Sequence, residues 1–156
     1  MAEMTSQNLA EHESYWSLPI DGYRILQLRL DFAFGMEIGD TQSEFSIRIN
    51  TAFTLRNSEG IRDYPVERLS EIGPAMRLLN TDIEDAKGFK DGRLEITFST
   101  NTVLSVDVDP QFEAWEFVSN KANGMRVVAM PGGKLAIWSD TQPCVPKADS
   151  SFRGSV

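Results

Sequence analysis

The amino-acid sequence predicts an α+β fold built mostly from antiparallel sheet, with seven to nine strands and one interrupted helix near residues 65–80. Apolar and polar residues alternate along several segments, and Phe45, Ile47 and Ile49 show this pattern clearly. Such alternation is typical of a strand with one buried face and one wet face. Short turn sequences separate these segments, and helical spacing is confined to one interval.

The first predicted strands occupy residues 23–30, 31–38 and 44–55. In the second of them every other residue is apolar, namely Phe32, Phe34, Met36 and Ile38. A polar turn at residues 39–43 leads into the third strand. We therefore expect Phe32 to lie in a strand and to share a face with Phe34.

A helix is predicted after Pro65, which suits a first-turn position. Gly73-Pro74 interrupts it, and residues 75–79 resume it for about one turn. We expect four apolar side chains to pack on the sheet at helical spacing: Leu69, Ile72, Met76 and Leu79.

The second half returns to strands, at residues 83–89, 94–98, 103–108, 112–118, 125–130 and 134–138. Asp91-Gly92 is the strongest short hairpin signal in the chain. The 112–118 segment has apolar residues on both faces, which predicts a deeply buried strand. Its two faces are Phe112, Ala114 and Val118 on one side and Trp115 and Phe117 on the other.

The two halves of the chain follow a similar order of segments. In each half an alternating strand (FSIRI, LSVDV) ends at an Asn or Asp break before a segment that contains Phe (NTAF, DPQF). An internal duplication and a recurring β-meander rhythm both account for this order.

One domain is expected at residues 15–139, between a flexible lead at residues 1–14 and a disordered or loosely attached tail at residues 140–156. A chain of 156 residues, 41% of them hydrophobic, can bury a core without disulfides or metal. The predicted core residues are Phe34, Ile47, Leu69, Ile96, Phe98, Val106, Trp115 and Phe117.

The net charge restricts the class of binding partner, and the lack of targeting signals indicates the cellular compartment. The formal net charge of −8 disfavours direct nucleic-acid binding. An acidic surface most commonly serves solubility, and it can also steer a basic protein partner. No stretch has the character of a signal peptide or a membrane span. Cys144 has no second cysteine to pair with. The sequence therefore predicts a cytoplasmic protein.

No catalytic, cofactor-binding or metal-binding constellation is recognisable. One histidine, His12, and one cysteine cannot supply a zinc site. The acidic residues Asp82, Glu84 and Asp85 lack the glycine and the distal glutamate of a calcium loop. We expect no cofactor and no metal.

Three carboxylates and one tryptophan are the candidates for a functional surface. Asp107 and Asp109 should share one face of a strand, with Glu95 on the polar face of its neighbour. Trp16 precedes the first long strand, and tryptophan is enriched at interface hot spots. Paired carboxylates can also catalyse hydrolysis, so a small carboxylate-dependent hydrolase or isomerase remains an alternative. A structural domain that binds a small ligand is another.

The end of the predicted domain, FEAWEFV followed by VVAMPGGKLAIW, resembles the closing signature of a family of small uncharacterised bacterial proteins, frequent in actinobacteria. Residues 16–22 and the segment KDGRLEITFSTNTVLSVD agree with this resemblance. The family has no assigned activity, so the resemblance implies no catalytic residues. By analogy, such short, acidic, mostly β proteins look like the immunity proteins of bacterial toxin systems.

The leading hypothesis is a non-catalytic protein-binding module. Its most concrete form is an immunity protein that occupies the active site of a cognate toxin. The residues expected to bind this partner are Glu95, Asp107, Asp109 and Trp16.

Overall fold

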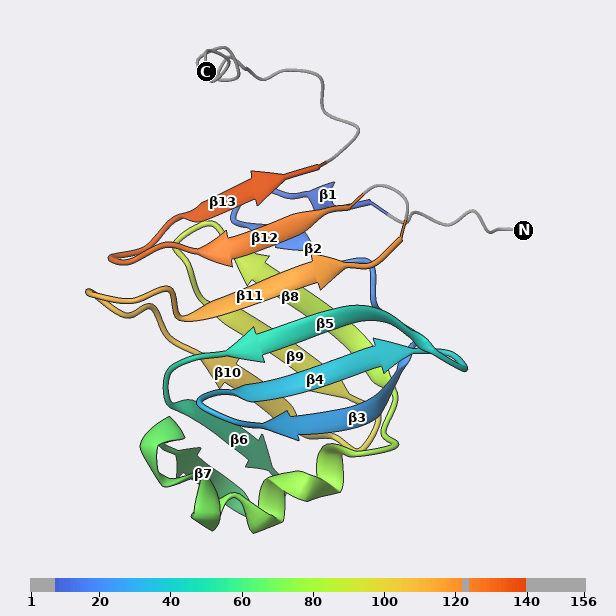
Figure 1. The fold of residues 1–156 in the computed structure, drawn as a ribbon, viewed down its shortest axis with the longest axis vertical. Coiled ribbons are helices and arrows are strands. Elements are labelled where there is room, and N and C mark those ends of the chain that lie inside the picture. The colour runs from blue at the N-terminus through green and yellow to red at the C-terminus, as the bar shows by residue number, and fades with distance from the viewer. Residues whose placement is uncertain (1–7, 122–123, 140–156) are drawn as a thin grey trace.

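Two antiparallel sheets face each other and enclose the core (Figure 1). The computed structural model describes residues 8–121 and 124–139. The seven-stranded sheet has the order β1 (Ala10–Glu11), β2 (Tyr15–Ser17), β8 (Ile83–Phe89), β9 (Leu94–Phe98), β10 (Val103–Val106), β6 (Phe53–Asn57), β7 (Gly60–Tyr64). The six-stranded sheet has the order β13 (Leu135–Trp138), β12 (Arg126–Ala129), β11 (Trp115–Ser119), β5 (Ser43–Ile49), β4 (Phe34–Gly39), β3 (Arg24–Leu30). In Figure 1 the second sheet lies in front, and the strands of the first cross behind it at a steep angle.

The mostly antiparallel architecture is confirmed, but the strand number is higher than predicted. The described residues form thirteen strands, from β1 to β13, instead of seven to nine. The predicted strand at residues 44–55 is two strands, because the chain leaves one sheet after Ile49 and enters the other at Phe53. The short strand β1 lies inside the segment predicted to be a flexible lead. A strand of two residues is too short to show an alternation of apolar and polar residues in the sequence. Residues 1–7 and the predicted tail at 140–156 lie outside the described residues.

The predicted interrupted helix is present, but it consists of two short 3₁₀ helices, so the α component of the fold is small. They are η2 (Val66–Glu71) and η3 (Gly73–Leu78). A 3₁₀ helix repeats every three residues, and the buried side chains follow that period: Ile72, Ala75 and Leu78. The expectation that Met76 and Leu79 pack on the sheet was wrong, since they are 43% and 39% exposed. The side chain of Leu69 lies outside the described part.

Apart from Leu69, the predicted core is confirmed. The other seven residues are at most 1% exposed: Phe34, Ile47, Ile96, Phe98, Val106, Trp115 and Phe117. They come from both sheets, and rings such as Phe45 and Phe117 stack with centroids 5.7 Å apart. The core therefore fills the space between the sheets, as in a β-sandwich.

Two phenylalanines that the sequence placed in strands lie on the surface instead. Phe32 is 92% exposed and Phe112 is 62% exposed. Phe32 precedes β4 in a turn, and Phe112 precedes β11 in a loop. The prediction that residues 112–118 are buried on both faces was therefore wrong. Val118, on the outer face of β11, is only half-buried.

The two halves of the chain contribute equivalent strands. In the first half β3, β4 and β5 form part of the six-stranded sheet, and β6 and β7 then join the other sheet. In the second half β8, β9 and β10 belong to the seven-stranded sheet, and β11 and β12 then join the six-stranded one. The last strand before one crossing pairs with the first strand after the other, so β5 pairs with β11 and β10 pairs with β6. The similar order of segments in the sequence thus corresponds to a similar path in space.

Trp115 on β11 connects the two sheets. Its indole Nε1 donates a hydrogen bond of 2.9 Å to the carbonyl oxygen of Gly92, in the β8–β9 turn of the opposite sheet. A Cβ atom on Gly88 would lie 3.0 Å from the indole Cη2. The absence of a side chain at Gly88 therefore lets the ring pack directly against β8.

Glycine turns from the two sheets also pack against each other. Gly92 has a φ of 105°, and a Cβ atom there would lie 2.6 Å from Val108. A Cβ atom on Gly133, whose φ is 106°, would lie 2.8 Å from the carbonyl oxygen of Asp91. Only glycine combines these φ values with this close approach. Gly133 of the PGG sequence is thus required for packing as well as for the turn.

Truncation of Trp115 to alanine should lower the free energy of unfolding by about 3–5 kcal/mol, because it empties a fully buried site and leaves a carbonyl without its donor. Urea denaturation followed by far-UV circular dichroism measures the change. An unchanged midpoint would contradict the packing described for this ring.

Gly88→Ala should destabilise the fold by about 1–3 kcal/mol, because the new methyl group presses on the indole of Trp115. Gly73→Ala is the matched control, since nothing lies within 4 Å of a Cβ atom at that position. Equal urea midpoints for the two variants would show that the contact at Gly88 is not tight.

Candidate functional site

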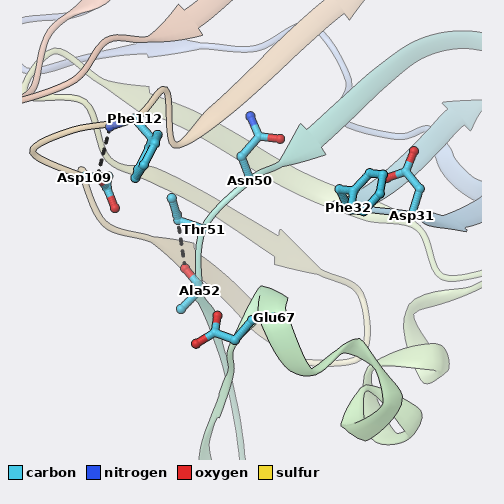
Figure 2. A pocket seen from close by; sticks show the side chains of 8 residues that line it. All are labelled: Asp31, Phe32, Asn50, Thr51, Ala52, Glu67, Asp109 and Phe112. Atoms are coloured by element: carbon cyan, nitrogen blue, oxygen red, sulfur yellow. Dashed lines mark hydrogen bonds between the residues drawn. The ribbon is translucent and has the colours of Figure 1, made fainter.

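A cleft opens where the chain crosses between the sheets twice. Because β5 pairs with β11 and β6 with β10, the β5–β6 and β10–β11 connections lie side by side. Asn50 joins them. Its backbone N–H donates to the carbonyl of Ala114 at 2.8 Å, and its Nδ2 donates to the carbonyl of Glu113 at 3.1 Å. The cleft has a volume of about 570 Å³ and is lined by Asp31, Phe32, Asn50, Thr51, Ala52, Glu67, Asp109 and Phe112 (Figure 2).

The two exposed phenylalanines belong to this cleft. Figure 2 shows Phe112 toward one end and Phe32 toward the other, with Asn50 and Thr51 between them. A singly exposed apolar residue is ordinary on a protein surface. Two phenylalanine rings that line one cleft are less so, and exposed apolar groups that cluster are typical of an interaction site.

Aspartate side chains hold both phenylalanine turns. Asp109 Oδ1 accepts hydrogen bonds from the backbone N–H groups of Gln111 at 2.8 Å and Phe112 at 2.9 Å. Asp31 Oδ1 accepts one from the N–H of Ala33 at 3.0 Å, across Phe32. Both are Asx-type turns, in which the side chain replaces a backbone acceptor. They fix the backbone that carries each ring.

The cleft carries more negative than positive charge. Asp31, Glu67 and Asp109 line it, and the guanidinium of Arg48 lies near with its Nη1 3.2 Å from Asp31 Oδ2. This hydrogen bond is the main cause that lowers the pKa of the Asp31 carboxyl below its usual value, and the N–H of Ala33 adds to it. Asp31 therefore stays ionised at neutral pH, and Glu67 is exposed.

The lining of the cleft combines carboxylates with aromatic rings. Its eight residues include neither His nor Cys, and the one serine-like group is Thr51, whose hydroxyl faces the backbone carbonyl of Ala52 at 3.5 Å. Asp109 Oδ1 already accepts two backbone hydrogen bonds. Carboxylates beside exposed aromatic rings can receive a cationic side chain and an apolar one together.

The predicted site residues do not all meet at this cleft. Asp109 lines it, while Asp107 and Asp109 together line an adjoining shallow cavity of about 500 Å³ with Asp63 and Arg68. Strand β10 ends at Val106, so these two aspartates follow the strand and do not continue it as predicted.

The other two predicted residues lie elsewhere. Glu95 is half-buried on the outer face of β9, opposite Lys87 and Ser105. Trp16 is half-buried on β2, opposite Gly88, and the ammonium of Lys90 lies 5.7 Å from its ring centroid.

The residues that sequence reasoning missed at the cleft are Phe32, Phe112, Asp31 and Glu67. A usable signal was present for the first two. Asp31 stands directly before Phe32, and the sequence Asp109-Pro110 stands just before Phe112. An aspartate that caps N–H groups two or three residues on is a turn signal, and it should have overruled the apolar alternation. No sequence signal places Glu67 at the cleft, because the folded chain brings η2 to it from a distant part of the sequence.

Metal and membrane features are not evident in the described part of the chain. Residues 8–121 and 124–139 bring together no group of three or more His, Cys, Asp or Glu that could hold a metal ion. Within the same residues no helix has the length and apolar character needed to cross a bilayer.

The fold and the cleft define a small antiparallel two-sheet protein with an acidic, phenylalanine-bearing surface. The chain belongs to a family of unknown function, DUF6188, whose model matches residues 16–139. Comparisons with curated proteins and with solved structures gave no match.

The Asp31 turn should persist at pH values below the usual pKa of an aspartate, 3.8. Because the pKa of Asp31 is lowered in the folded state, its contribution is present above the unfolded pKa and is lost as the pH falls through the folded one. NMR titration of the side-chain carboxyl carbon measures this pKa. Arg48→Gln should raise it toward the usual value, and an identical titration in that variant would contradict the assigned cause.

Proposed function

We propose that this protein is a non-catalytic protein-binding module whose cleft between the two sheet crossings docks a partner with a basic surface. The observation that carries the proposal is the exposure of Phe32, at 92%, and Phe112, at 62%, on turns that aspartate side chains hold in place. Aromatic side chains contribute strongly to the cores of protein interfaces.

Preorganisation supports a binding role. Association costs free energy when loops and side chains become ordered at an interface. The backbone of both phenylalanine turns is already fixed by hydrogen bonds to Asp31 and Asp109, and Asn50 ties the two connections together. The cleft therefore needs little backbone rearrangement to receive a partner.

Charge supports a basic partner. The chain has a formal net charge of −8, and Asp31, Glu67 and Asp109 line the cleft itself. Complementary charge speeds encounter and rejects acidic competitors, and both effects weaken at high salt.

The more specific form of the proposal is an immunity protein that occupies the active site of a cognate toxin. An inhibitor of this kind needs a rigid scaffold, exposed aromatic anchors and negative charge that complements a basic active site. The cleft has these features. The competing assignment, a small hydrolase or isomerase that uses Glu95, Asp107 or Asp109, has less support, because Glu95 does not line the cavity that Asp107 and Asp109 line, although its cross-strand neighbour Ser105 does.

The test is the affinity of the chain for the protein encoded beside its own gene, measured by isothermal titration calorimetry. Phe32→Ala combined with Phe112→Ala should weaken the complex about 100-fold or more, because each anchor contributes on the order of 1–2 kcal/mol. Met76→Ala is the matched control, since it removes an exposed apolar side chain outside the cleft. Association should also slow as salt rises.

Two outcomes would contradict the proposal. Unchanged affinity of the double phenylalanine variant would show that the partner binds elsewhere. Failure of the neighbouring gene product to bind, or to lose its toxicity when this chain is co-expressed, would refute the immunity assignment.

A further inference from the structure

A second groove lies between the β6–β7 hairpin, η3 and the β9–β10 turn. Figure 1 shows the β6–β7 hairpin and the 3₁₀ helices at the bottom of the view. The groove has a volume of about 500 Å³ and shares no lining residue with the phenylalanine cleft. It is lined by Leu55, Asn57, Ser58, Glu59, Gly60, Ile61, Arg62, Tyr64, Pro74, Arg77, Leu78, Thr100 and Thr102.

Two unpaired cations line this groove. Neither Arg62 nor Arg77 has a carboxylate oxygen within 4.0 Å in the described part of the chain. Arg56, on the same hairpin, also lacks one in that part. The six other described arginines each form an ion pair. In a protein of net charge −8, carboxylates are available to pair most surface arginines. Two that remain unpaired in one concave site are positioned to bind an anion.

A buried hydroxyl lies beside these arginines. Tyr64 is 4% exposed, lines the groove, and has no hydrogen-bond partner for its hydroxyl among the described residues. Its ring stacks on Phe53 with centroids 5.3 Å apart, which fixes its position. Its hydroxyl can therefore donate a hydrogen bond to an acceptor atom of a ligand in the groove.

The two arginines and the tyrosine line the same groove. Arg62 and Tyr64 stand two residues apart on β7, so their side chains share one face of the strand. Burial raises the pKa of Tyr64, while the charges of Arg62 and Arg77 act to lower it. An oxyanion placed between them would accept charge-assisted hydrogen bonds from two sides and one from the tyrosine.

The other residues that line the groove indicate which chemical group the anionic ligand carries. Hydroxyl groups are present at Ser58, Thr100 and Thr102, and the Oγ1 atoms of Thr100 and Thr102 lie 3.1 Å apart. Apolar side chains from Leu55, Ile61, Pro74 and Leu78 complete the walls. One carboxylate, Glu59, also lines the groove and disfavours an anion near its own side. This combination fits a small organic molecule with one charged end and one apolar end.

We propose that this groove binds the phosphate group of a small phosphate monoester, with Arg62, Arg77 and Tyr64 around the phosphate and the apolar walls around the ester group. Phosphate offers enough oxygens to engage both guanidinium groups and the phenol at once. The groove is separate from the phenylalanine cleft, so this proposal does not depend on the proposed protein-binding role.

The test is a titration of the full chain with phenyl phosphate. Binding is measured by isothermal titration calorimetry and by the NMR chemical-shift changes of the Thr100 and Thr102 amides. Binding with a Kd of about 1 mM or tighter is expected. Inorganic phosphate should bind more weakly because it leaves the apolar walls unfilled, and phenol should bind weakly because it lacks the charge. No binding of phenyl phosphate would overturn the proposal.

Substitutions separate a specific site from general charge attraction. Arg62→Gln and Arg77→Gln should each weaken phenyl phosphate binding about tenfold or more, since each removes a charge-assisted contact. Arg56→Gln is the matched control, because it removes an unpaired charge from the same hairpin outside the groove. An equal loss of affinity in this control would show that only long-range charge is involved, which would overturn the proposal.

Tyr64→Phe tests the buried hydroxyl and has an independent readout. It should weaken phenyl phosphate binding, yet leave the urea midpoint of the free protein unchanged or raised, because no protein partner is lost. A variant that is clearly destabilised and binds phenyl phosphate as tightly as the native chain would show that the hydroxyl serves the fold and not a ligand.

Discussion

The hydrogen bond from the indole of Trp115 to the carbonyl of Gly92 joins the six-stranded sheet to the turn of a hairpin in the other sheet. In a sandwich most contacts between sheets are apolar and non-directional, whereas a buried hydrogen bond has a defined direction and distance. The contact needs bare backbone at Gly88 beneath the ring. The same turn packs against Gly133, so it also sets where the β12–β13 hairpin lies. The relative placement of the sheets, and hence of the phenylalanine cleft that residues of both sheets line, depends on this arrangement.

The phenylalanine cleft follows from the way the chain changes sheets. A strand that crosses between two layers must leave its hydrogen-bonded ladder, and the freed backbone groups need other partners. Here two crossings lie side by side and satisfy part of that need through Asn50, while aspartates cap the adjoining turns. The fold therefore concentrates fixed, irregular backbone at one place. Side chains that emerge from it have no sheet to cover them, which is why Phe32 and Phe112 face the solvent.

The sequence predicted the strands well wherever apolar residues alternate, because burial of one sheet face imposes a period of two. It failed where a different constraint governs the backbone. Phe32 is in phase with Phe34, but an aspartate turn intervenes between them. Met76 is in phase with an α-helix, whereas the segment winds as a 3₁₀ helix. The cleft and the groove could not be predicted, since each joins residues that are distant along the chain and are brought together by sheet order.

The pairing of β5 with β11 and of β6 with β10 also has a consequence for how the protein folds. Each sheet contains a pair of neighbouring strands that come from different halves of the chain, so neither half can complete a sheet by itself. Forming these pairs requires residues some 50 to 70 positions apart to meet before most of the interior is shielded from water. Chains dominated by such distant pairings fold slowly. Until the pairs form, the exposed edges of β5 and β6 are open to strands of other molecules, and the crossing that shapes the binding surface is also the step at which folding competes with aggregation.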